Sequence, residues 1–170
     1  MHRDGSRSLL LTLTSAILLM GIFSLLPDGL YQRVFCRIPA ALSAAYFGAE
    51  CHGTSFRLRT GLEVSVTRAC GGSDFFALLC GLGLAAGWRA RRRQPATGWL
   101  GRLLLHVLLA LGATLLVNGM RIIVTVYTRL AAEPFLPARF LGAVHLFSGV
   151  LVFFPALLFL VKYGKLEGET

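Results

Sequence analysis

A cysteine followed by two glycines, Cys70-Gly71-Gly72, stands just ahead of an apolar run in this chain of 170 residues. If residues 75–88 are helical, Cys70 sits just before the N-terminus of that helix, where unbonded N–H groups and the helix dipole favour negative charge. This environment favours the thiolate, which is the nucleophilic form of cysteine. Because Gly71 and Gly72 lack side chains, their amides could approach a substrate carbonyl and form an oxyanion hole. The alternative is a small apolar cysteine packed in a loop.

Arg121 and His145 could supply the other groups that a cysteine nucleophile needs. His145 can take the proton of Cys70 and later return it to a leaving amine. Arg121 can pair with the thiolate or bind the oxyanion of a tetrahedral intermediate, and both roles stay open. Asn118, one helical turn before Arg121, could orient it or donate to the substrate. The simpler alternatives are an arginine that snorkels to the membrane surface and a histidine that is hydrogen-bonded locally.

The composition indicates a membrane protein, because 55% of the residues are hydrophobic and only 15% are charged. The net charge of +9 is explained by Lys and Arg beside membrane helices, and no nucleic-acid motif is present. The four cysteines do not form a disulfide framework, although a Cys36–Cys51 disulfide and two free thiols remain alternatives. No known ligand spacing predicts a metal site, and no cofactor is expected.

The apolar runs predict an all-α polytopic membrane protein that forms a single domain over residues 1–170. Its transmembrane helices are about four in number and cover roughly residues 9–26, 74–88, 99–130 and 144–162. Ser73 or Asp74 is expected to cap the second helix. Arginines 89, 91, 92 and 93 place the following loop in the cytoplasm, so Cys70 lies on the outer side.

The segment from residue 27 to residue 73 is expected outside the membrane. A re-entrant or interfacial helix is predicted near Pro39–Phe47. Alternating residues over Phe56–Thr67 predict a small extracytoplasmic β-hairpin with a three-residue loop at Thr60-Gly61-Leu62. The expected cross-strand pairs are Arg59 with Glu63, Leu58 with Val64 and Phe56 with Val66.

This topology predicts that the thiol, the guanidinium and the imidazole lie at the same depth in the membrane. Cys70, Arg121 and His145 lie on different segments, yet each comes out at or just below the outer surface of the membrane. Ionisable residues inside membrane segments are costly and usually face a partner or a cavity. The sequence therefore predicts acyl transfer through a thioester at the outer membrane boundary.

These residues, in their order and spacing, resemble the Cys…Arg…His set of the exosortase/archaeosortase family, and most of all the short exosortase K subgroup. The resemblance rests on the motifs Ala69-Cys70-Gly71-Gly72 and Asn118-Gly119-Met120-Arg121-Ile122, together with His145 opening the last helix. It implies a membrane cysteine transpeptidase with Cys70 as the nucleophile and Arg121 and His145 as essential residues. One departure is Gly71, because many members carry Ser or Thr directly after the cysteine.

The resemblance also implies a substrate and a location. Family members cleave a C-terminal sorting signal, made of a short motif, a membrane helix and a basic tail, from exported proteins. The new C-terminus passes to an acceptor at the cell surface. The expected partners are membrane lipid and such exported proteins, in the bacterial cytoplasmic (inner) membrane with the active site facing the periplasm or outside. Two alternatives remain: a non-enzymatic assembly factor or transporter subunit, and a thiol–disulfide or metal-handling membrane protein.

Overall fold

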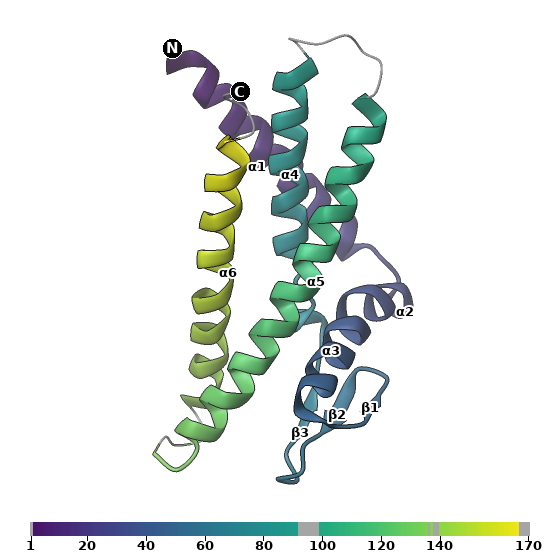
Figure 1. Ribbon diagram of the computed structural model, residues 1–170, viewed down its shortest axis with the longest axis vertical. Helices are drawn as coiled ribbons and strands as arrows, with labels where there is room; N and C mark the ends of the chain where they lie inside the picture. The colour runs from purple at the N-terminus through teal and green to yellow at the C-terminus, as the bar shows by residue number, and fades with distance from the viewer. Residues whose placement is uncertain (1, 92–98, 136, 138–139, 167–170) are drawn as a thin grey trace. The chain divides into compact units, whose positions relative to one another are not determined.

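The computed structural model describes residues 2–91, 99–135, 137 and 140–166, and these are mostly helical with one small sheet (Figure 1). Residues 92–98, which carry Arg92 and Arg93 of the predicted cytoplasmic loop, lie outside the described part. The long helices are α1 (His2–Ser24), α4 (Ser73–Arg91), α5 (Trp99–Ala132) and α6 (Leu141–Leu166). Each of them covers one of the four apolar segments that the sequence predicts as helical.

The spanning capacity of these helices differs. Among the described residues, Leu100–Ala132 is by itself long and apolar enough to cross a membrane. Leu10–Ser24 and Asp28–Phe47 pass the same test together as a bent pair, while Ser73–Ala85 and Leu146–Phe159 are shorter apolar helices. A mostly helical, apolar architecture is therefore present, and four complete crossings stay a prediction.

The chain divides into two compact units, each described by itself below. The first unit comprises Met1–Cys36 and Arg68–Leu115, and the second comprises Arg37–Thr67 and Leu116–Thr170.

In the first unit, α1 packs along α4 (Figure 1). The two helices approach closely at Gly81, where a Cβ atom would lie 2.7 Å from the carbonyl oxygen of Thr12. Close helix contact through small residues is the usual packing mode of helices in membranes, because little else drives their association there. At the end of α1, the ring of Phe23 lies 5.6 Å from that of Phe35 and 5.4 Å from that of Phe76. This aromatic cluster fixes the start of α4 against the end of α1.

Four short helical segments follow α1 along the chain, three of them before the sheet and one just before α4. They are α2 (Asp28–Tyr31), the π-helix η1 (Gln32–Arg37) and α3 (Ile38–Phe47), and the 3₁₀ helix η2 (Arg68–Cys70) precedes α4. The predicted short helix at Pro39–Phe47 is confirmed as α3, with the proline in its first turn, where a missing N–H costs nothing. The interfacial position of α3 stays a prediction.

The second unit contains an antiparallel sheet of three short strands in the order β1 (Cys51–His52), β2 (Ser55–Arg57) and β3 (Glu63–Ser65). The sequence predicted the β2–β3 hairpin and missed β1. Helix α3 lies beside the sheet (Figure 1). Its Phe47 stacks on Phe56 of β2 at 6.2 Å between ring centroids.

The predicted register of the hairpin is wrong by two residues. Phe56 pairs with Val64, not Val66, and Glu63 pairs with Arg57, not Arg59. Because side chains alternate with a period of two along a strand, this shift leaves every residue on its predicted face.

The loop of the hairpin explains the shift. Leu58 faces Leu62 through a backbone hydrogen bond of 2.9 Å, so the three-residue loop covers residues 59–61 and not 60–62. Gly61, the last loop residue, has a φ of 86°. A three-residue hairpin loop requires a residue with positive φ at this point, and glycine adopts it at no steric cost.

Candidate active site

Cys70 ends the 3₁₀ helix η2 and stands just ahead of α4. The turn between them closes through a hydrogen bond from the Gly71 N–H to the Arg68 carbonyl at 3.1 Å. Gly72 has a φ of 74°, a left-handed conformation that a side chain would strain. Its carbonyl accepts the first helical bond from Phe76 at 3.0 Å, so Gly72 is the N-cap and the expected capping by Ser73 or Asp74 is wrong.

The four cysteines lie in different surroundings. Cys36 and Cys80 are buried, whereas Cys51 and Cys70 are half-buried. Burial raises the pKa of the Cys36 thiol, a negative charge on Cys70 raises it further, and Arg68 opposes both effects. Of the two half-buried thiols, Cys70 is the one that precedes a long helix. Cys36 belongs to the first unit and Cys51 to the second, so a disulfide between them stays an alternative.

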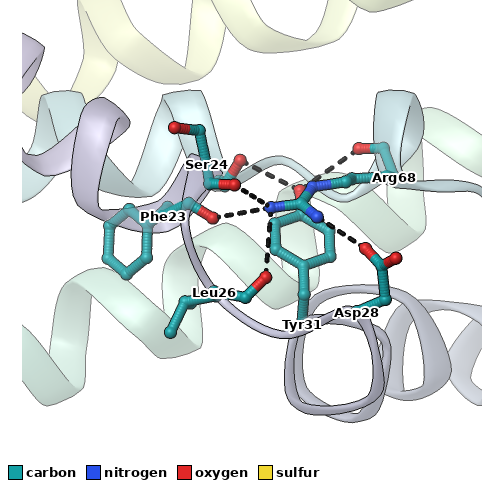
Figure 2. Close-up of polar contacts among 7 residues, drawn as sticks. Phe23, Ser24, Leu26, Asp28, Tyr31 and Arg68 are labelled. Atoms are coloured by element: carbon teal, nitrogen blue, oxygen red, sulfur yellow. Dashed lines mark hydrogen bonds and ion pairs between the residues drawn. The ribbon is translucent and has the colours of Figure 1, made fainter.

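Arg68, two residues before Cys70, ties this turn to the end of α1 (Figure 2). Its Nη2 donates to the carbonyls of Phe23 at 2.9 Å, Ser24 at 2.8 Å and Leu26 at 3.5 Å, and its Nη1 pairs with Asp28 at 2.6 Å. Phe23 and Ser24 lie in the last turn of α1, which carries the negative end of the helix dipole, and Leu26 follows shortly after this helix. Arg68 therefore has a structural role, because it links the Cys70 turn to the end of α1.

Tyr31 bridges the two sides of the Cys70 turn. Its hydroxyl donates to the Arg68 carbonyl at 3.2 Å and shares a hydrogen bond of 2.9 Å with the Ser73 hydroxyl. Its ring lies beneath the Arg68 guanidinium, whose Cζ is 4.6 Å from the ring centroid. Sequence reasoning missed Tyr31, because no local pattern connects a tyrosine to a turn 37 residues away.

In the second unit, Arg121 of α5 is buried, with 8% of its surface exposed, and lies against α6. A Cβ atom at Gly149 would be 3.0 Å from its Nε and 3.3 Å from its Nη2, so the absence of a side chain there admits the guanidinium. Its Cζ also lies 5.1 Å from the ring centroid of Phe153, within the range of a cation–π contact. This burial disagrees with the alternative of an arginine that snorkels into solvent.

Further polar groups surround Arg121. Asn118 is fully buried one turn earlier on α5. Thr125, one turn later, donates to the Arg121 carbonyl at 2.8 Å and forms a hydrogen bond of 2.7 Å with the Ser148 hydroxyl of α6. Because the carbonyl can only accept, Ser148 is the donor to Thr125. This hydroxyl pair joins α5 to α6 beside Gly149.

His145 lies in the second turn of α6, which begins at Leu141, so the expectation that His145 opens this helix is wrong. It stands one helical turn before Gly149, the residue that Arg121 contacts. The structure thus brings Arg121 to the part of α6 that carries His145.

Cys70, Gly71 and Gly72 lie in the first unit, and Arg121, Asn118 and His145 lie in the second. The convergence of the thiol with the arginine and the histidine stays a prediction. In the part of the chain that the structure describes, no group of three or more His, Cys, Asp or Glu side chains could hold a metal ion.

The long helices of the described chain are apolar, and one of them is long enough to cross a membrane, as in a membrane protein. Residues 5–162 match the family model described as transmembrane exosortase (Exosortase_EpsH), and the chain belongs to this family. Neither a search of curated proteins nor a search of solved structures finds a match.

Proposed function

We propose that this protein is a membrane-embedded cysteine transpeptidase or protease that cleaves C-terminal sorting signals of exported proteins. Cys70 forms a thioester with the substrate at the outer face of the bacterial cytoplasmic membrane. The observation that carries the proposal is the placement of Cys70, a half-buried cysteine directly before the N-terminus of α4. Membership of the transmembrane exosortase family supports the same chemistry.

In the proposed reaction, Cys70 gives its proton to His145, and the sulfur attacks the carbonyl carbon of the scissile peptide bond. The C–N bond then breaks, and His145 returns the proton to the leaving amine. The remaining acyl group stays on Cys70 as a thioester. Water, or an amine or hydroxyl of a surface acceptor, attacks the thioester and returns a proton to the sulfur through His145.

Arg121 stabilises negative charge in this scheme, either on the thiolate or on the oxyanion of the tetrahedral intermediate. Its burial supports this role, because a fixed cation in a water-poor site acts more strongly than one in solvent. Asn118 orients the guanidinium or donates to the substrate, and the Gly71 and Gly72 amides provide further donors.

The substrate's own membrane helix would pack against the protein and bring its scissile bond to Cys70. Large apolar side chains of α6 are exposed and suit contact with lipid or with such a helix; they are Leu146, Phe147, Val150, Leu151 and Phe154. The basic tail of the sorting signal would then stay on the cytoplasmic side.

The test follows a tagged exported protein that ends in a motif, a membrane helix and a basic tail. We expect Cys70→Ala to abolish its processing and Cys51→Ala, the matched change at the other half-buried thiol, to leave processing intact. A covalent adduct that hydroxylamine cleaves should form on Cys70 during processing by the parent, and it should be absent from Cys70→Ala. Unchanged processing by Cys70→Ala would refute the proposal and favour a non-enzymatic membrane module.

A further inference from the structure

We propose that Tyr31 is a positioning residue for the Cys70 nucleophile, holding both sides of the turn through its hydroxyl and covering Gly71 with its ring. This inference rests on the proposed function and deepens it. It starts from one juxtaposition in the first unit, in which a single phenol contacts the backbone before the cysteine and the side chain after it.

The ring of Tyr31 is held firmly. It is 2% exposed, and its centroid lies 5.2 Å from that of Phe35 on one side and 4.6 Å from the Arg68 guanidinium carbon on another. Since Arg68 is itself tied to Asp28 and to the end of α1, the position of the ring depends on several elements. A side chain locked by packing and hydrogen bonds can hold a functional group within a narrow range of geometry.

The hydroxyl acts at both ends of the turn. Its bonds to the Arg68 carbonyl and the Ser73 hydroxyl span the residues on either side of Cys70. Burial is the main cause that raises the pKa of Tyr31, so the phenol keeps the proton that it donates. The turn therefore has a fixed width, and the sulfur and the following amides keep one orientation.

Gly71 shows how closely Tyr31 covers the turn. A Cβ atom at residue 71 would collide with the Tyr31 hydroxyl and would lie 2.8 Å from Cε1 and 2.9 Å from Cζ. Only glycine fits beneath the ring without displacing it. The tyrosine and the glycine act as one unit around the nucleophile.

The principal test compares Tyr31→Phe with Tyr46→Phe, a matched removal of a phenolic hydroxyl on an exposed side chain in the second unit. We expect Tyr31→Phe to lower kcat for substrate processing by roughly 2- to 10-fold, with KM little changed, because one neutral hydrogen-bonding group is lost. In a variant whose only cysteine is Cys70, maleimide alkylation should show a changed rate and pH profile. Tyr46→Phe should match the parent in both measurements.

The outcomes separate this inference from the proposed function. Equal kcat and equal alkylation for Tyr31→Phe and the parent would overturn the positioning role while leaving Cys70-dependent processing in place. A loss of activity that only follows a lower melting temperature, with an unchanged alkylation profile, would also overturn it. If Cys70→Ala leaves processing intact, the proposed function fails, yet the alkylation measurement still decides whether Tyr31 orders the turn.

A double-mutant cycle provides a second measurement. Gly71→Ala should lower both processing and the alkylation rate in the parent, but it should add little to the loss already caused by Tyr31→Ala, which removes the ring. Gly112→Ala, where an added Cβ meets nothing within 4 Å, is the matched control. Additive losses for Gly71→Ala and Tyr31→Ala would contradict the coupling.

Discussion

The guanidinium of Arg121 occupies the space beside Gly149 that any other residue would fill with its Cβ atom. A Cβ atom at residue 149 would lie 3.0 Å from Nε and 3.4 Å from Cζ, so the guanidinium would have to shift by a few tenths of an ångström. The position of the Arg121 side chain therefore depends on Gly149 of α6, a residue with no reactive group.

We expect Gly149→Ala to reduce substrate processing by about tenfold, because it must displace the guanidinium by a few tenths of an ångström. The melting temperature of the Gly149→Ala variant should not fall much, since alanine has a higher helix propensity than glycine. Gly142→Ala, on the same helix with open space around the added Cβ, is the control. Processing assays combined with melting temperatures would separate the effects, and equal activity of the two variants would contradict the proposed role of this contact.

The hydroxyl pair of Thr125 and Ser148 should stabilise the second unit. Thr125→Val removes a partly buried interhelical hydrogen bond of 2.7 Å, and we expect a loss of about 0.5–1.5 kcal/mol in the free energy of unfolding. Thr128→Val is the matched control, because the Thr128 hydroxyl bonds back to its own helix at Val124. Unfolding in detergent micelles gives the measurement, and a double-mutant cycle with Ser148→Ala should give a non-zero coupling energy.

The stability that Arg68 contributes should come more from its hydrogen bonds to the carbonyls at the end of α1 than from its ion pair with Asp28. We expect Arg68→Gln to cost about 1.5–3 kcal/mol of stability, because three carbonyls lose a charged donor. Asp28→Asn should cost less than about 1 kcal/mol, since the Asp28 side chain is largely exposed. Arg57→Gln, which breaks an exposed ion pair with Glu63, serves as a further control. A larger loss for Asp28→Asn than for Arg68→Gln would contradict this ranking.

Cys36 should make stability depend on alkaline pH. Burial raises the pKa of its thiol above the ordinary value of 9.0, so the folded state keeps a proton that the unfolded state releases. The stabilisation is fully present below pH 9.0 and falls as the pH rises through the folded-state pKa. Melting temperatures across this range should fall more steeply for the parent than for Cys36→Ala, and Cys51→Ala should behave like the parent. Identical slopes for the parent and Cys36→Ala would show that this thiol does not control the effect.

The helical part of the fold was predictable, because long apolar runs bounded by charge and proline have few other solutions. The faces of the hairpin were predictable for a similar reason, since alternation survives a shift of two residues. The register was not, because it depends on the backbone conformation of Gly61, and the pattern of side chains does not encode that conformation directly.

The surroundings of the site were less accessible to sequence reasoning. The Cys70 turn was found because its residues are adjacent, and Arg121 because a charge stands out in an apolar helix. Tyr31 and Gly149 act through tertiary contacts with no signal at local spacing. Even the N-cap of α4 was assigned to Ser73 or Asp74, because the Tyr31 hydroxyl that engages Ser73 comes from a distant segment.

The space that Tyr31 occupies over Gly71 has an evolutionary consequence. A relative with Ser or Thr at this position would have to place a Cβ atom where this protein has the phenol of Tyr31. Positions 31 and 71 should therefore covary among relatives, with tyrosine retained where glycine follows the cysteine and replaced or rotated away where it does not.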